Sequence, residues 1–160
     1  MRLLILFLTI ILFTNIYAAS YMFDNARILS LAGAGGASEA LPLQYNPANL
    51  NNLNFQLIET NYIRYYNFSD LYKTSLIYGF HTQNLPIKIG LMYDKQSVYD
   101  LDQETFIFSS ALKINKIYSG INLKKYDFNY QSLGEHDNSY GIDMGLIYPF
   151  EQFNVHLISR

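Results

Sequence analysis

Apolar and polar residues alternate with a period of two along most of the chain from Asn54 onward. The segment YKTSLIYGFHT (72–82) is typical. One of its faces carries Tyr72, Thr74, Leu76, Tyr78 and Phe80. The opposite face carries polar or small residues, among them Lys73, Ser75 and Gly79. Successive side chains of a β-strand point to opposite faces of a sheet, so this period predicts strands.

The alternation predicts seven strands, separated by turn residues. They cover residues 54–66, 72–82, 85–94, 104–115, 117–129, 138–149 and 153–159. Several of these runs are 10 to 13 residues long, whereas strands of soluble proteins usually have about 5–6 residues. A tilted strand that spans a membrane needs about 9–11 residues. The fold class predicted is therefore all-β, an antiparallel outer-membrane β-barrel.

The predicted connections alternate in length. Residues 83–84, 116 and 150–152 form short links, and residues 67–71, 95–103 and 130–137 form longer, more polar ones. Outer-membrane barrels have short periplasmic turns and longer extracellular loops. The alternation therefore places the segment before Asn54 on the periplasmic side.

The N-terminus has the pattern of a cleaved signal peptide over residues 1–19. Arg2 precedes an apolar run, and the small residues Ala18 and Ala19 offer a cleavage site. The run from Leu3 to Phe13 is too short to span a bilayer as a helix, which takes about 20 residues. An uncleaved N-terminal anchor is the alternative. The pattern predicts export, and with the strands it predicts the outer membrane as the location.

Composition agrees with this picture. Charged residues make up 15% of the chain and aromatic residues 16%, whereas ordinary soluble domains have about 25% charged residues. A net charge of −2 and the absence of a long basic block give no reason to expect nucleic-acid binding. The sequence contains no Cys, which excludes disulfides and lipid attachment through a thiol.

The stretch SLAGAGGASEALPLQYNPANL (30–50) looks at first like a phosphate-binding glycine loop. It lacks the full spacing of a dinucleotide loop and the Lys-Ser/Thr ending of a nucleotide loop. Pro42 and Pro47 also leave little room for the helix that must follow such a loop. We predict no cofactor here, and a close-packed small-residue segment followed by an Asn-Pro turn.

No catalytic or metal-binding pattern emerges. The acidic residues Asp100, Asp102 and Glu104 lack the glycine and terminal glutamate of a calcium loop, so they are interpreted as solvated loop acids. The histidines are far apart and show no metal-ligand spacing; they are His81, His136 and His156. The chain is predicted not to be an enzyme and to bind no metal.

The N-terminal stretch resembles that of the FadL-like outer-membrane barrels, in particular the PorV/PorQ-type and related uncharacterised proteins. The likeness rests on Ala26-Arg27 and on two motifs, which comprise Gly35, Gly36 and Ala37, and Asn46, Pro47 and Ala48 followed by Leu50. The resemblance implies a plug of residues 20–53 inside a barrel formed from residues 54–160. It also implies passage of small hydrophobic molecules, or anchoring of secreted proteins, in contact with membrane lipid.

Family members are longer, so the resemblance implies that the chain is an N-terminal fragment with an incomplete barrel of about seven strands. Open edges would then favour self-association between copies. The alternative function is that of a soluble, secreted lipocalin-like binding protein. In that case the apolar face of the sheet points inward, and Lys73, Lys88 and Asp143 face water.

Overall fold

The computed structural model describes residues 43–54, 56–65, 68–81, 86–149 and 154–159 of the chain. One short 3-10 helix, η2 (Pro47–Asn52), precedes the strands. The strands are β1 (Leu57–Arg64), β2 (Leu71–His81), β3 (Ile87–Val98), β4 (Leu101–Ile114), β5 (Ile117–Tyr130), β6 (Glu135–Pro149) and β7 (Asn154–Ser159). No helix in this part of the chain is both long and apolar enough to cross a membrane.

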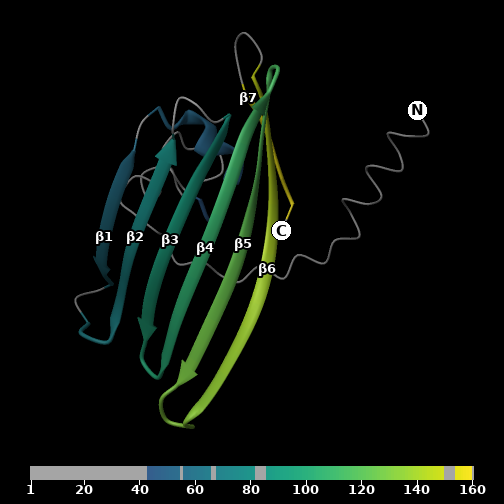
Figure 1. The fold of residues 1–160 in the computed structure, drawn as a ribbon. Coiled ribbons are helices and arrows are strands. Elements are labelled where there is room, and N and C mark those ends of the chain that lie inside the picture. Colours follow the sequence, from purple (N-terminus) through teal and green to yellow (C-terminus); the bar gives the residue numbers. More distant parts are fainter. Residues whose placement is uncertain (1–42, 55, 66–67, 82–85, 150–153, 160) are drawn as a thin grey trace.

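All seven strands belong to one antiparallel sheet, in the order β1 to β7 (Figure 1). Each strand therefore pairs with its neighbours in sequence. The prediction of an all-β fold with seven antiparallel strands is confirmed. The described sheet is open, with β1 and β7 as its edges.

The prediction of long links at 95–103 and 130–137 is wrong. β3 continues to Val98 and β4 begins at Leu101, so only two residues lie between them. β5 likewise continues to Tyr130 and β6 begins at Glu135. Polar residues are typical of loops, but here they form ladder pairs, such as Lys95 opposite Glu104. Polarity here marks side chains that extend beyond the apolar part of the sheet.

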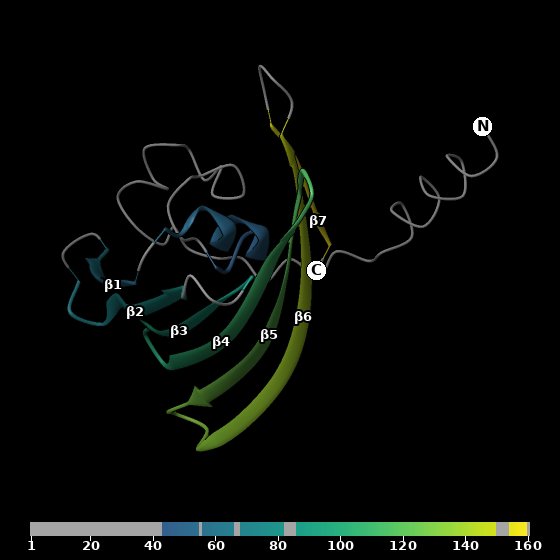
Figure 2. The ribbon, with the colours of Figure 1, turned by 45° about the horizontal axis from the view of Figure 1, so that its top comes forward.

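The two faces of the sheet differ sharply in polarity. The sheet curves around η2, which lies on its concave side (Figure 2). The concave face buries polar and charged side chains, namely Lys73, Ser75, Asp94, Thr105, Ser109, Asn122, Lys124 and Asp143. The convex face exposes large apolar side chains, among them Leu76, Leu91, Phe106, Phe108, Leu123, Ile142, Met144 and Leu146. This arrangement is the reverse of a sheet that packs its apolar face into a water-soluble core.

Residues 43–53, which include η2, lie against the concave face. The rest of the predicted plug, like the predicted signal peptide at 1–19, lies outside the described residues. A plug also needs a closed lumen around it, which an open sheet does not supply. The observed feature is therefore a short buried segment packed on the concave face, here called the 43–53 segment.

Candidate functional site

The Asn46-Pro47-Ala48 motif starts the buried 3-10 helix. Asn46 is its N-cap, with an extended backbone, and its Oδ1 accepts a hydrogen bond from the Ala48 N–H at 3.0 Å. Pro47 follows at the first helical turn, where its missing N–H has no intrahelical partner in any case. All three residues are buried. The predicted Asn-Pro turn is thus a helix cap seated inside the protein, and Gly35, Gly36 and Ala37 lie outside the described residues.

Glycines on the concave face let the 43–53 segment approach the strands closely. Gly120 and Gly145 are direct neighbours across β5 and β6. A Cβ at Gly120 would lie 2.5 Å from the carbonyl carbon of Pro47 and 2.7 Å from the Ala48 nitrogen. A Cβ at Gly145 would overlap Oδ1 of Asn46. Any side chain at these two positions would therefore displace the start of the helix.

Polar side chains of β5 hold the main chain of the segment. The Asn122 side-chain amide donates to the Leu43 carbonyl, and Lys124 Nζ donates to the Gln44 carbonyl at 3.2 Å. The Asp143 carboxylate on β6 organises both donors. It lies 2.5 Å from Lys124 Nζ and accepts from Asn122 at 3.2 Å. These side chains are buried, so the ion pair forms where water cannot screen it.

A second group of contacts holds the end of η2. Lys88 Nζ donates to the carbonyls of Asn51 and Leu53, each at 2.5 Å. The Asn51 amide in turn donates to the carbonyls of Leu112 at 3.3 Å and Ser119 at 3.2 Å. The last carbonyls of a helix lack intrahelical donors, so an ammonium group is a suitable partner for them. Both ends of the segment are therefore bound to the sheet through hydrogen bonds.

Between these polar contacts the segment packs on an apolar cluster. Leu43, Leu50 and Leu53 from the segment meet side chains of three strands. The strand members of the cluster are Ile77, Met92, Ile107 and Ala111. We call this cluster the apolar seam. It is the one continuous apolar patch in the otherwise polar contact between the segment and the concave face among the described residues.

A further buried ion pair lies on the concave face, on β2 and β3. Lys73 Nζ is 3.4 Å from the Asp94 carboxylate, and both side chains are at least nine-tenths buried. Burying two charges costs several kcal/mol unless they are paired. The concave face therefore combines paired charges with the seat for the segment.

On the convex face the apolar side chains form a band that ends at an aromatic row. Five neighbouring strands place Leu76, Tyr93, Phe106, Lys125 and Tyr140 side by side in that row. The next row toward the β3–β4 turn contains Lys95, Glu104 and Asp127. Two residues along β3 and β4 therefore take the surface from aromatic to charged side chains.

Hydrogen bonds connect the β3–β4 turn to the β5–β6 turn. The Ser132 N–H donates to Asp100 at 2.7 Å, and the Gln131 amide donates to Asp102 at 2.9 Å. The Ser97 hydroxyl also donates to Asp102 at 2.6 Å, and this bond lowers the pKa of the Asp102 carboxyl below 3.8. These acids are bound by protein donors, and no group of residues in the described parts of the chain has the makings of a metal site.

The histidines do not come together. His81 lies on β2, His136 on β6 and His156 on β7. His136 is exposed and His81 is partly buried. The three histidines, whose spacing in the sequence shows no metal-binding pattern, thus lie on three different strands.

Sequence reasoning missed the strand residues that contact the segment. Gly120 and Gly145 were not singled out from the sequence, although a glycine inside a strand is a signal for close approach of another backbone. Asn122 and Lys124 follow Gly120 at every second position of β5 and therefore lie on the same concave face. Their pairing with Asp143 depends on the register between β5 and β6, which one sequence does not reveal.

Comparison with known proteins finds no family model, no curated protein and no solved structure that matches the chain. The resemblance to FadL-like barrels therefore stays a prediction. The class defined by the coordinates is an open, seven-stranded antiparallel sheet with a buried segment on its concave face.

Proposed function

We propose that the chain forms the membrane-spanning wall of an outer-membrane β-barrel of the FadL/PorV type, and that residues 20–53 act as its plug. One observation carries the proposal: the sheet exposes its apolar face and buries its charged face. Exposing large apolar side chains to water is unfavourable by about 25 cal/mol per Å². A bilayer around the convex face removes that cost.

The height of the apolar band supports the proposal. On β4 the convex face is apolar or small from Phe106 to Ile114, a separation of eight residues. At about 3.4 Å per residue this is roughly 27 Å along the strand, or about 21 Å across a membrane for a tilt near 40°. Outer-membrane barrels have an apolar band about 25 Å tall, flanked by aromatic girdles. The row with Tyr93, Phe106 and Tyr140 has the position of such a girdle.

The function that fits this wall best is passage of small hydrophobic molecules. The apolar seam gives such a molecule a surface between the 43–53 segment and the sheet. The seam is closed by its own side chains, so passage requires the segment to move. Hydrogen bonds from strand side chains to the segment's main-chain carbonyls hold it on the sheet, and such bonds can break when the segment moves.

Uptake of labelled fatty acids or aromatic hydrocarbons by cells tests this function. A strain that lacks the gene should take up less than its parent. Gly120→Ala should raise uptake, because the new Cβ pushes Pro47 and Ala48 away from the sheet. Gly141→Ala is the matched control, since its Cβ would make only ordinary contacts at 3.5 Å or more. Equal uptake in the deletion strain and its parent overturns passage as the function.

Anchoring of secreted proteins is the second candidate, and the connected hairpins favour it. The β3–β4 and β5–β6 turns are joined by hydrogen bonds from Gln131 and Ser132 to Asp100 and Asp102. They form a polar, stiff platform beyond the apolar band. Crosslinking in whole cells followed by purification should then recover a secreted partner, and Asp100→Ala should reduce the yield. Recovery of the chain alone overturns this candidate.

The lipocalin-like alternative requires the opposite arrangement of faces. Lys73 and Asp143 would contact water outside the barrel, whereas both are buried on the concave face. Cell fractionation separates the two classes of protein. Recovery of the mature chain in the soluble periplasm without detergent would exclude the membrane proposal.

A further inference from the structure

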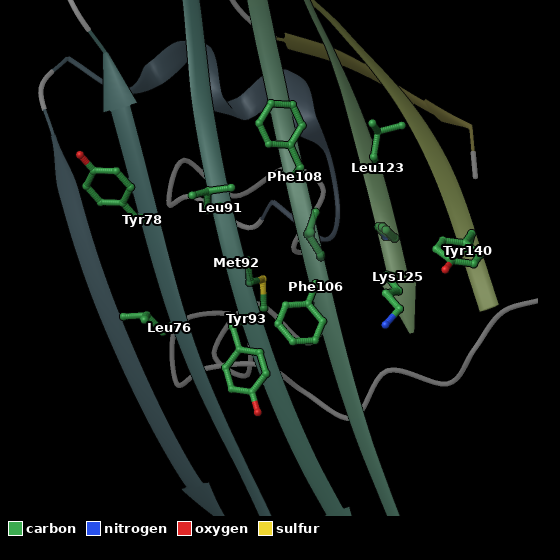
Figure 3. Close-up of a pocket in the computed structure, with 12 residues that line it drawn as sticks. Leu76, Tyr78, Leu91, Met92, Tyr93, Phe106, Phe108, Leu123, Lys125 and Tyr140 are labelled. Atoms are coloured by element: carbon green, nitrogen blue, oxygen red, sulfur yellow. The ribbon is translucent and has the colours of Figure 1, made fainter. Parts of the chain in front are cut away.

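The convex face contains a cavity of about 550 Å³, lined almost entirely by apolar groups. Its walls are side chains of β2 to β6, including Leu91, Phe108 and Leu123, and its polar end is bordered by Lys125 and Tyr140 (Figure 3). The volume is within the range of about 300–1,000 Å³ that is usual for small-molecule sites. We call this cavity the convex groove. It opens on the face of the sheet opposite the 43–53 segment, and its lining includes Met92 and Ile107, which also belong to the apolar seam.

Charges follow the groove in a fixed order. Lys125 lies in the aromatic row that ends the apolar band, opposite Phe106 and Tyr140. The next row places the carboxylates of Glu104 and Asp127 directly opposite each other. Going from the groove toward the β3–β4 turn, the surface is first apolar, then cationic at Lys125, then a row in which Lys95 lies beside the two carboxylates.

Each of the two carboxylates is paired with one lysine in an exposed ion pair. Lys95 Nζ lies 3.1 Å from Glu104, and Lys125 Nζ lies 2.8 Å from Asp127. All four side chains are about one-third or more exposed, and exposed ion pairs contribute little. Like charges directly opposite each other on a sheet are destabilising. Because both ion pairs are exposed and weak, a ligand that brings its own ammonium and phosphate can exchange for them.

We propose that the convex groove is a specific site for a phospholipid whose headgroup carries both a phosphate and a primary ammonium, as in phosphatidylethanolamine. An acyl chain fills the groove, the phosphate pairs with Lys125, and the ammonium donates to Glu104 and Asp127. The order of groups in the lipid matches the order of the surface. An anionic headgroup without the ammonium would meet two carboxylates, and a quaternary ammonium has no N–H to donate to them.

The proposal rests on the membrane location proposed above, and one experiment separates the two. The chain contains no Trp, so a single introduced Trp is a unique fluorophore. Phe106→Trp places it in the groove, and Leu146→Trp places it on the convex face outside the groove. Both native side chains are 44% exposed, which makes the pair a matched comparison. Phe108→Trp, also at a 44% exposed position in the groove, is a second probe if the first variant does not fold.

The variants are reconstituted in vesicles in which brominated phosphatidylethanolamine competes with unlabelled phosphatidylglycerol, and in the reverse mixture. Bromine quenches a neighbouring Trp, so quenching reports which lipid occupies each position. We expect the groove probe to favour phosphatidylethanolamine several-fold and the control probe to favour neither lipid. Asp127→Asn in the groove-probe variant should bring the ratio of quenching by the two lipids close to one.

Each outcome has a distinct meaning. Equal quenching by the two lipids at both probes overturns the specific site and leaves the membrane location intact. A preference in the groove that persists in Asp127→Asn overturns the role of the carboxylates in recognition. Absence of quenching at every probe position means that the chain is not in the bilayer, which overturns the proposed function and the lipid site with it.

Discussion

The glycine seat for the 43–53 segment gives the sharpest test of how the concave face is built. Replacing Gly120 by Ala adds one Cβ that would lie 2.5 to 2.7 Å from three main-chain atoms of Pro47 and Ala48. Non-bonded Cβ contacts below 3.0 Å essentially do not occur, so something must shift. The obstructing atoms are backbone atoms of a buried helix start, which cannot rotate away as the end of a side chain can. The 43–53 segment must therefore lift.

Overpacking of this kind costs about 1–3 kcal/mol. If that cost falls on the packed state, the open state of the segment becomes about 5- to 150-fold more populated. A cysteine replacing Leu50 measures this opening, because Leu50 is fully buried and the chain has no other thiol. The rate of labelling by a maleimide should rise by that factor in Gly120→Ala.

Gly141→Ala is the control for this measurement. Gly141 lies on the same face of β6 as Gly145, but the nearest atom to its added Cβ is a side-chain carbon of Tyr126 at 3.5 Å. Its labelling rate should equal that of the parent Leu50→Cys protein. Equal labelling rates in Gly120→Ala and Gly141→Ala would refute the argument that Gly120 is needed for the segment to pack against the sheet.

Two other predictions concern charged groups. Lys124→Gln leaves the buried Asp143 carboxylate without its ion-pair partner and should lower the free energy of unfolding by about 3–5 kcal/mol. Lys125→Gln breaks an exposed pair and should lower the free energy of unfolding far less. Denaturant unfolding in detergent compares the two variants. The pKa of Asp102 is lowered chiefly by the Ser97 hydroxyl, and this group lies outside the apolar band. Its stabilising contribution is therefore complete above its unfolded pKa of about 3.9 and is lost as pH falls through its lower folded value. Hydrogen-exchange protection at the β5–β6 turn, taken relative to the intrinsic exchange rate at each pH, should fall below about pH 4. Ser97→Ala should move the onset to higher pH, and an onset unchanged by Ser97→Ala would contradict this assignment.

The strands could be predicted from the sequence because alternation is a local property. Tyr72 to Phe80 and Tyr140 to Tyr148 show the same period that the structure shows as two faces. The ends of the strands were harder to predict. The pairs from Lys95 to Ser97 with Asp102 to Glu104 are polar on both strands, and their ladder depends on partners that a single-strand pattern does not contain.

The site was predictable only in part, for a related reason. Asn46 to Ala48 form a local cap, and the Asn-Pro signal identified it as a structural element. The residues that contact the 43–53 segment come from β3, β5 and β6. They lie close together only because of the register and curvature of the sheet. Lys88 and Asn51 are 37 positions apart in the chain. No local pattern connects an ammonium on one strand with the carbonyls at the end of a helix.

The strand number has a consequence for how this sheet can be completed. Because the seven described strands are all antiparallel, β1 and β7 run in the same direction. If a second copy were inserted into the membrane in the same orientation, its β1 and β7 would run parallel to β1 and β7 of the first copy. Continuous antiparallel closure instead requires a partner element with an odd number of strands, or a copy inserted upside down with its polar hairpins on the opposite side of the membrane. Parity thus restricts self-association through the open edges to parallel pairing or inverted insertion.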